Sequence, residues 1–230
     1  AFPHNEQVAY HAVIALLKKG ALDQALVETK KHLENVQLRS KHFLFHFLQA
    51  QIFLQKNNKS EALLAVNKSL ELFPKFDRGW LFKGMLLEQK RENKEAITCY
   101  QKVLALVGRE ELVEKQLVHL LFSEQRYAEA AHYLERINGT CAEYFFDLAL
   151  IYARAGKSTK AVATIDKALE RDPHLHRARL LKIDLLAQKK MPKELTKELA
   201  LWLQLYPQES KEGLQVLMLL RQQLVKTEPL

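Results

Sequence analysis

The chain has 230 residues, of which 48% are hydrophobic and 27% charged, with only seven glycines, six prolines and a formal net charge of +8. This composition is too apolar for a disordered chain and too poor in glycine and proline for a loop-rich β protein. Its two cysteines exclude a disulfide framework, and no apolar run reaches the roughly 18 to 20 residues of a membrane-spanning helix. We therefore expect a soluble globular protein.

Six similar segments follow one another along the chain, each marked by a residue that comes directly after a polar cluster. The markers are Ala25, Ala62, Ala96, Ala130, Ala161 and Leu195, at intervals of 37, 34, 34, 31 and 34 residues. On both sides of each polar cluster, apolar residues recur at spacings of three and four, as on an amphipathic helix. Each segment is therefore predicted to be a helix, a tight polar turn and an antiparallel helix.

The third and fifth segments carry a more detailed pattern. The third has Trp80, Gly84, Leu87, Ala96 and Tyr100. The fifth has Phe145, Leu148, Ala149, Tyr152, Gly156, Ala161, Ile165, Ala168 and Pro173. This pattern resembles the tetratricopeptide repeat, W-x2-L-G-x2-Y followed by A-x3-F or Y and then P. The resemblance implies an all-α fold, a right-handed α-solenoid of antiparallel helix pairs.

We predict a single solenoid over residues 1–230. Its repeats cover residues 6–42, 43–76, 77–110, 111–141, 142–175 and 176–209, and a helix over 210–226 caps the last repeat. Small residues such as Gly84 let the two helices of a pair approach closely, and larger residues fill the space between pairs. Because no pair buries both of its faces alone, stability is expected to come from stacking.

A partner-binding groove is the expected functional feature, because repeat solenoids bind partners on extended concave surfaces. The resemblance implies that certain positions of each first helix face this groove. Carried over one by one, they are Tyr10, Ile14, Leu44, Phe47, Gln51, Arg78, Leu81, Met85, Lys115, His119, Phe122, Phe146, Leu150, Arg154, Arg177 and Leu180, together with Leu17, Leu54, Glu88, Leu112 and Asp184. Phe47, Met85, Phe122, Phe146 and Leu150 are the predicted anchors, and the four cations are predicted to make flanking contacts with acidic groups.

The chain departs from the family at one of these groove positions. The family favours asparagine there, to hold a peptide backbone, whereas this chain has Ile14, Gln51, Met85, His119, Leu150 and Asp184. No three successive repeats supply the lysine, asparagine and arginine set that grips chaperone C-termini. The predicted groove is mainly apolar, which fits an amphipathic helix or a hydrophobic peptide.

Catalytic and cofactor-binding motifs are missing from the sequence. It contains no glycine-rich phosphate-binding loop, no H-E-x-x-H and no G-x-S-x-G, so we predict neither an enzyme nor a cofactor. His42 and His46 are spaced as two metal ligands on one helix face, but no third ligand is placed beside them, and no metal is predicted. The positive charge is nearly uniform along the chain, which argues against nucleic acid as a partner.

These patterns predict a non-enzymatic adaptor or chaperone-like protein that binds an apolar or amphipathic segment of another protein. The alternative is a structural assembly subunit that self-associates through its terminal helices, including a homo-oligomer formed through residues 210–226. A basic scaffold associated with nucleic acid is a third reading. We expect a cytoplasmic location; a processed, exported form is the alternative, because the first residue is Ala1.

Overall fold

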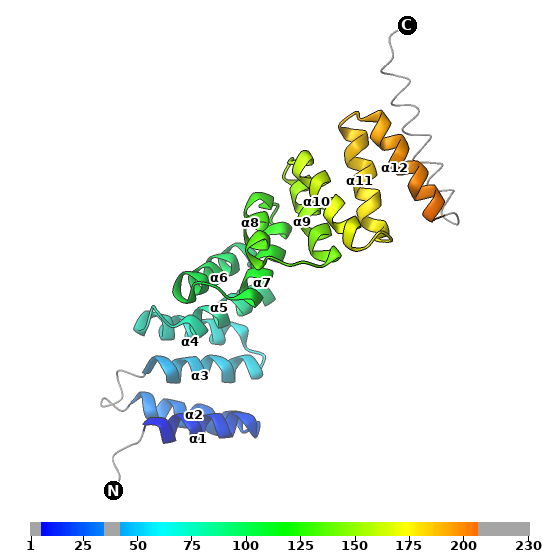
Figure 1. Ribbon diagram of the computed structural model, residues 1–230. Helices are drawn as coiled ribbons and strands as arrows, with labels where there is room; N and C mark the ends of the chain where they lie inside the picture. The colour runs from blue at the N-terminus through cyan, green and yellow to red at the C-terminus, as the bar shows by residue number, and fades with distance from the viewer. Residues whose placement is uncertain (1–5, 35–41, 207–230) are drawn as a thin grey trace. The chain divides into compact units, whose positions relative to one another are not determined.

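The computed structural model describes residues 6–34 and 42–206. In these ranges the chain consists of twelve α-helices joined by short turns, without a strand (Figure 1). Each of these helices is too short or too polar to cross a lipid bilayer. The predicted capping helix at 210–226 lies outside the described residues. The chain forms two compact units, residues 1–113 and 114–230, which we call the N-terminal and C-terminal units.

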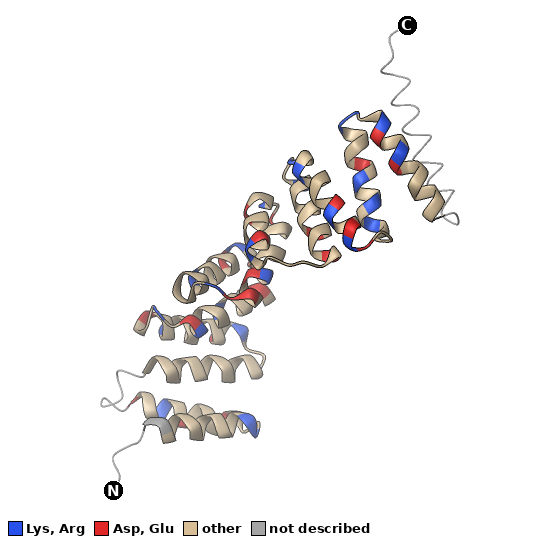
Figure 2. Cartoon of the chain, viewed as in Figure 1, with Lys and Arg blue, Asp and Glu red and all other residues tan. Residues whose placement is uncertain are grey.

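Six helices make up most of the N-terminal unit. They are α1 (Glu6–Lys18), α2 (Leu22–Leu33), α3 (His42–Gln55), α4 (Lys59–Leu72), α5 (Asp77–Gln89) and α6 (Asn93–Val107). Each contacts the next in chain order, so that the helices stack one upon another (Figure 1). One of them, α3, carries no lysine, arginine, aspartate or glutamate along its whole length (Figure 2).

The C-terminal unit continues the same arrangement. It takes in most of α7 (Glu111–Ser123), and then α8 (Tyr127–Ile137), α9 (Ala142–Arg154), α10 (Ser158–Arg171), α11 (His176–Gln188) and α12 (Pro192–Leu205). From α8 onward each helix again contacts its successor. Pro74 and Pro173 each follow the end of a second helix by two residues, where proline does not interrupt helical hydrogen bonds.

The turn inside each helix pair contains one residue with a left-handed backbone. These residues are Gly20, Asn57, Arg91, Gln125, Gly156 and Lys190, with φ between 54° and 75°. Two backbone hydrogen bonds close each turn; at Gly156 they run from Gly156 N to Ala153 O (3.1 Å) and from Lys157 N to Tyr152 O (2.9 Å). The six residues have the same spacing as the sequence markers, so the repeat seen in the sequence is a repeat of this turn.

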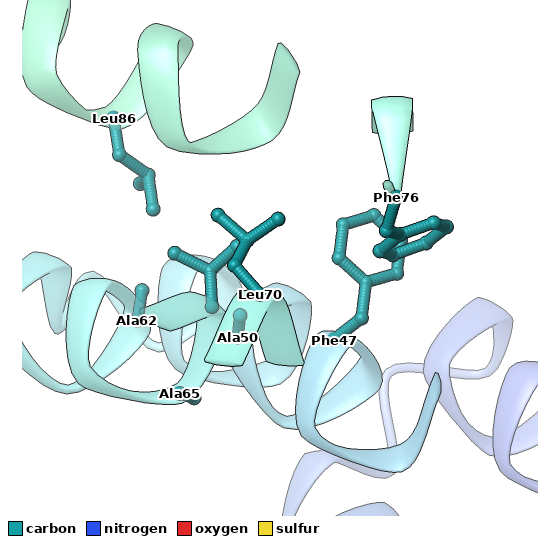
Figure 3. Packing of buried hydrophobic residues seen from close by; sticks show 8 residues of the cluster. Phe47, Ala50, Ala62, Ala65, Leu70, Phe76 and Leu86 are labelled. Carbon is teal, nitrogen blue, oxygen red and sulfur yellow. The ribbon is translucent and has the colours of Figure 1, made fainter. Parts of the chain in front are cut away.

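Aromatic residues and small residues have different packing roles in the core of the N-terminal unit. The ring of Phe47 on α3 meets that of Phe76 edge to face, with centroids 5.0 Å apart, and Leu86 of α5 points toward the helix that carries Ala62 (Figure 3). Edge-to-face pairs place a positive ring edge on a negative ring face. These large residues therefore fill the space between successive helix pairs, and the alanines bring the helices of one pair together.

Gly84 marks the closest approach between α5 and α6. A Cβ atom added at this residue would lie 2.8 Å from Cε1 of Tyr100, whose buried ring packs against the glycine. The ring is held in place, because the Tyr100 hydroxyl donates a hydrogen bond to Glu88 Oε2 at 2.9 Å. Burial and, next, this hydrogen bond raise the pKa of Tyr100.

We predict that Gly84→Ala lowers the free energy of unfolding by about 1 to 2 kcal/mol, because overpacking outweighs the helix propensity that alanine adds. Urea denaturation measures the change. In a Tyr100→Ala background the same substitution should stabilise the protein by up to about 1 kcal/mol, since the clash is gone. An equal effect in both backgrounds would show that the glycine is not needed for close approach.

A buried ion pair joins α11 to α12 in the C-terminal unit. Arg179 and Glu198 are only 4% and 7% exposed, and they form a direct hydrogen-bonded ion pair. Arg179 Nη2 also donates to the Pro173 carbonyl at 2.8 Å, and Lys182 Nζ lies 2.8 Å from both Glu198 Oε2 and Asp166 Oδ1. Burial by itself would lower the pKa of Lys182, but the hydrogen bonds to Asp166 and Glu198 outweigh it and raise the pKa.

We predict that Glu198→Ala lowers the free energy of unfolding by about 3 to 5 kcal/mol, because it leaves the Arg179 charge buried without its partner. Glu194→Ala, at an exposed residue of the same helix, is the matched control and should change stability by less than about 0.5 kcal/mol. Urea denaturation compares the two. A loss below about 1 kcal/mol for Glu198→Ala would mean that water reaches Arg179.

Candidate functional site

A groove of about 670 Å³ opens on the N-terminal unit, lined by the first helices of its three repeats. Each helix supplies four residues at spacings that place them on one helical face. They are Tyr10, Ile14, Leu17 and Lys18 of α1; Phe47, Gln51, Leu54 and Gln55 of α3; and Arg78, Leu81, Phe82 and Met85 of α5. Eight of these twelve side chains are aliphatic, aromatic or thioether groups.

The middle of the groove is electrically neutral. It is formed by α3, which contacts α1 on one side and whose Phe47 ring lies 5.4 Å from the Phe82 ring of α5 on the other. Because α3 has no lysine, arginine, aspartate or glutamate and lines the groove with Phe47, Gln51, Leu54 and Gln55, a ligand would meet only aromatic, aliphatic and amide groups there. Gln51 and Gln55 are the amides on this helix that reach the groove.

The apolar lining residues differ in how much they contribute to the core. Phe47 is 7% exposed and is held between Phe76 and Phe82, so it belongs to the core as well as to the groove. Leu17 packs into the cluster of Val13 and other buried residues. Met85, by contrast, is 45% exposed, which leaves its flexible thioether side chain available for contact with a ligand.

Two cations lie at opposite ends of the groove. Lys18 is the last residue of α1 and Arg78 the second of α5. The two helices of each pair are antiparallel, so the first helices of successive repeats, such as α1 and α5, run in the same direction. The end of α1 and the start of α5 therefore lie at opposite ends of the groove. Both side chains are exposed, neither has an ion-pair partner among the described residues, and the groove lining contains no carboxylate.

The structure brings together much of the predicted groove of the first three repeats. Tyr10, Ile14, Phe47, Gln51, Arg78, Leu81 and Met85 all line it, with Leu17 and Leu54. Lys18, Gln55 and Phe82 also line it and were not predicted. They follow Ile14, Gln51 and Arg78 by four residues, a spacing that places them on the same helix face and that could have revealed them.

Two residues predicted for this part of the groove lie elsewhere. Leu44 is half-buried and packs against the cluster that contains Phe47 and Ala50. Glu88 accepts the hydrogen bond from Tyr100. Both side chains therefore serve contacts between helices of the N-terminal unit.

Three of the residues predicted for the fifth and sixth repeats, Phe146, Arg177 and Leu180, contact other residues of the chain. Phe146 is 8% exposed, and the Arg177 guanidinium lies over its ring at 5.0 Å from the centroid. Arg177 Nη2 also lies 2.8 Å from Glu143 Oε2. Leu180 packs against the cluster that contains Trp202. The Arg177 guanidinium and the Phe146 ring, which were predicted to contact a partner, thus contact other residues of the chain instead.

The other residues predicted for the fourth, fifth and sixth repeats are spread over α7, α9 and α11. Lys115, His119 and Arg154 are exposed, and Leu150 is half-buried. Phe122 packs its ring edge to face against Tyr127, with centroids 5.3 Å apart. Leu112, at the start of α7, is exposed, and Asp184 accepts a hydrogen bond from the Gln188 amide at 2.8 Å.

The candidate metal ligands His42 and His46 lie on α3. His46 Nδ1 is 3.2 Å from Gln49 Oε1, and burial lowers the pKa of His46. Within the described ranges, no three histidine, cysteine, aspartate or glutamate side chains gather closely enough to hold a metal ion. Of the two cysteines, Cys141 is exposed and Cys99 is buried, and burial raises the pKa of the Cys99 thiol.

Several solved structures are similar to this chain. A chain in the structure of Naa15/Naa10 bound to HypK-THB matches with a TM-score of 0.70 and 17% identity, over 95% of this chain and 36% of that one. YrrB, described as a TPR protein with an unusual peptide-binding site, matches with a TM-score of 0.57 and 20% identity over 78% and 92% of the two chains. MamA from Desulfovibrio magneticus RS-1 matches with a TM-score of 0.53 and 18% identity over 74% and 97%.

At these identities the similarities show the fold. They confirm the predicted class, an all-α fold of antiparallel helix pairs of the tetratricopeptide solenoid type. No curated protein sequence matches the chain. A family model, described as tetratricopeptide repeat, matches residues 47–109 and 146–210, which together are more than half of the chain. The chain therefore belongs to the tetratricopeptide repeat family.

Proposed function

We propose that this protein is a non-enzymatic adaptor or chaperone-like protein that holds an apolar or amphipathic segment of another protein in the groove of α1, α3 and α5. Its fold is that of a protein–protein interaction scaffold. The observation that carries the proposal is the groove itself, in which apolar residues of three successive repeats line one continuous surface around the charge-free helix α3.

The exposure of Met85 supports this reading. A methionine side chain that is 45% exposed at a groove leaves apolar surface in water, and covering that surface is favourable by about 25 cal/mol per Å². A contiguous apolar surface of this kind usually marks an interaction site. Methionine also adapts its shape to different apolar side chains, which suits an adaptor that receives more than one segment.

The similar structures are compatible with a peptide ligand. YrrB is described as having an unusual peptide-binding site, and its chain shares the fold of this one. In the present chain, Gln51 stands at the position where the family favours asparagine, and it lines the groove together with Gln55. These two amides can orient a bound segment by hydrogen bonds, and the apolar side chains around them supply the contact area.

We predict that Met85→Glu reduces the amount of partner captured from a native cell lysate at least about tenfold, because it places a charge on the apolar surface that the partner covers. The matched control is Leu106→Glu, at a leucine of α6 that is 38% exposed and lies outside the groove. This variant should capture the partner as the unmodified protein does. Quantitative mass spectrometry of the captured proteins makes the comparison.

Folding must be separated from binding in this experiment. Met85→Glu should change the free energy of unfolding by less than about 0.5 kcal/mol, because the side chain already meets water. Phe47→Ala, at a buried neighbour, should cost about 3 to 5 kcal/mol and would not separate the two effects. If Met85→Glu captures the same proteins as the unmodified chain, and truncation at Pro207 dissociates a stable oligomer, the protein is an assembly subunit instead.

A further inference from the structure

The charges around the groove have one sign. Lys18 and Arg78 lie at its two ends, both exposed, and neither has an ion-pair partner among the described residues. No carboxylate lines the groove, and the residues that α3 contributes between the two cations are uncharged. A surface with cations alone at its ends attracts a ligand with anions at matching places and disfavours a ligand with cations there.

Other cations of the protein form ion pairs with carboxylates of the same chain. Arg177, in the C-terminal unit, pairs with Glu143 at 2.8 Å and stacks on Phe146. Lys182 pairs with both Asp166 and Glu198. The chain thus has carboxylates beside cations that serve its own packing, and the groove contains none beside Lys18 or Arg78.

The polar groups of the groove are few. They belong to Lys18, Arg78, Gln51, Gln55 and the Tyr10 hydroxyl, whereas the remaining lining is apolar. An extended peptide would place a row of backbone N–H and C=O groups against this lining, and most would lose water without gaining a partner. A helix pairs its backbone groups internally and presents only side chains. The lining therefore favours a helical occupant.

The dimensions of the groove set the length of that occupant. Packed helices lie about 8 to 10 Å apart, so a segment that crosses from α1 over α3 to α5 spans roughly 16 to 20 Å. Lys18 and Arg78 also lie at opposite ends of parallel helices, which adds an offset of roughly 16 Å along the helix axes. The diagonal between them is therefore roughly 23 to 26 Å, which corresponds to a helix of about 16 residues.

We infer that the occupant of the groove is an amphipathic α-helix of about 16 residues that carries an acidic residue at each end of its apolar face, one facing Lys18 and the other Arg78. The inference rests on the proposed function and specifies the ligand of the same site. The apolar face covers Met85, Leu81 and the surface of α3, and the two carboxylates fix the position of the helix along the groove.

Three labelled peptides of about 16 residues test this with the full chain by fluorescence anisotropy. All share leucines at helical spacing. The first has glutamate at both ends of the apolar face, the second has lysine there, and the third repeats the first with a proline at its centre. At low salt the acidic peptide should bind about fivefold to tenfold more tightly than the basic one, with the difference shrinking as salt is added. The central proline should weaken binding at least about tenfold, because it interrupts the helix.

Charge reversal in the protein provides the matched comparison. The double variant Lys18→Glu with Arg78→Glu should prefer the basic peptide. The control, Lys94→Glu with Lys102→Glu, changes the net charge equally at two exposed lysines of α6 outside the groove and should retain the acidic preference.

The outcomes separate this inference from the proposed function. Equal binding of the acidic and basic peptides overturns the acidic ends, and equal binding of the proline peptide overturns the helix. If none of the three peptides binds while Met85→Glu still removes the captured partner, the inference fails and the proposed function stands. If none binds and Met85→Glu captures the partner unchanged, both fail.

Discussion

The structure depends on one constraint: a pair of helices has two apolar faces and can cover only one of them by itself. Within a pair, the covered face closes as tightly as the contact between Gly84 and Tyr100, where the space for a single Cβ atom is already filled. The other face needs the next pair, as Phe47 packs against Phe82 from the following repeat and against Phe76 at the junction with it. Stability is therefore shared between neighbours, as in other repeat proteins, and the first helices come to lie in a row.

The row of first helices forms the groove. Some residues therefore contribute both to binding and to folding. Phe47 lines the groove and also fills the space between repeats, so its loss would affect both properties. Met85 lies one turn beyond Leu81 on the same helix but is 45% exposed. The groove thus combines buried, well-packed side chains such as Phe47 with exposed, flexible ones such as Met85. A ligand can contact the exposed side chains without displacing the buried ones, as is expected of a preformed binding site.

Charged residues have two different roles in this structure. In the C-terminal unit they are used internally, since Arg179 and Glu198 are buried together, Lys182 bridges Glu198 to Asp166, and Arg177 is paired with Glu143. A buried pair of this kind contributes little net stability, but breaking it is costly because one charge remains without its partner. In the N-terminal unit Lys18 and Arg78 stand at the groove with no carboxylate in its lining. The same residue types therefore hold helices together in one place and are available for a ligand in the other.

The sequence by itself determined the repeats and the helix pairs, because helical periodicity shows which residues share a helix face before any neighbour is known. That Tyr10, Ile14 and Met85 face the groove was implied by the resemblance to the tetratricopeptide repeat. The sequence also determined the places of the turns, where a left-handed residue recurs with the spacing of the markers. Only the tertiary structure decided which residues on that face stay open to a ligand. Whether Leu44 faces the groove or the core depends on how the helices of its own repeat pack. Whether Arg177 meets a partner or Glu143 depends on the residue that the preceding repeat brings opposite.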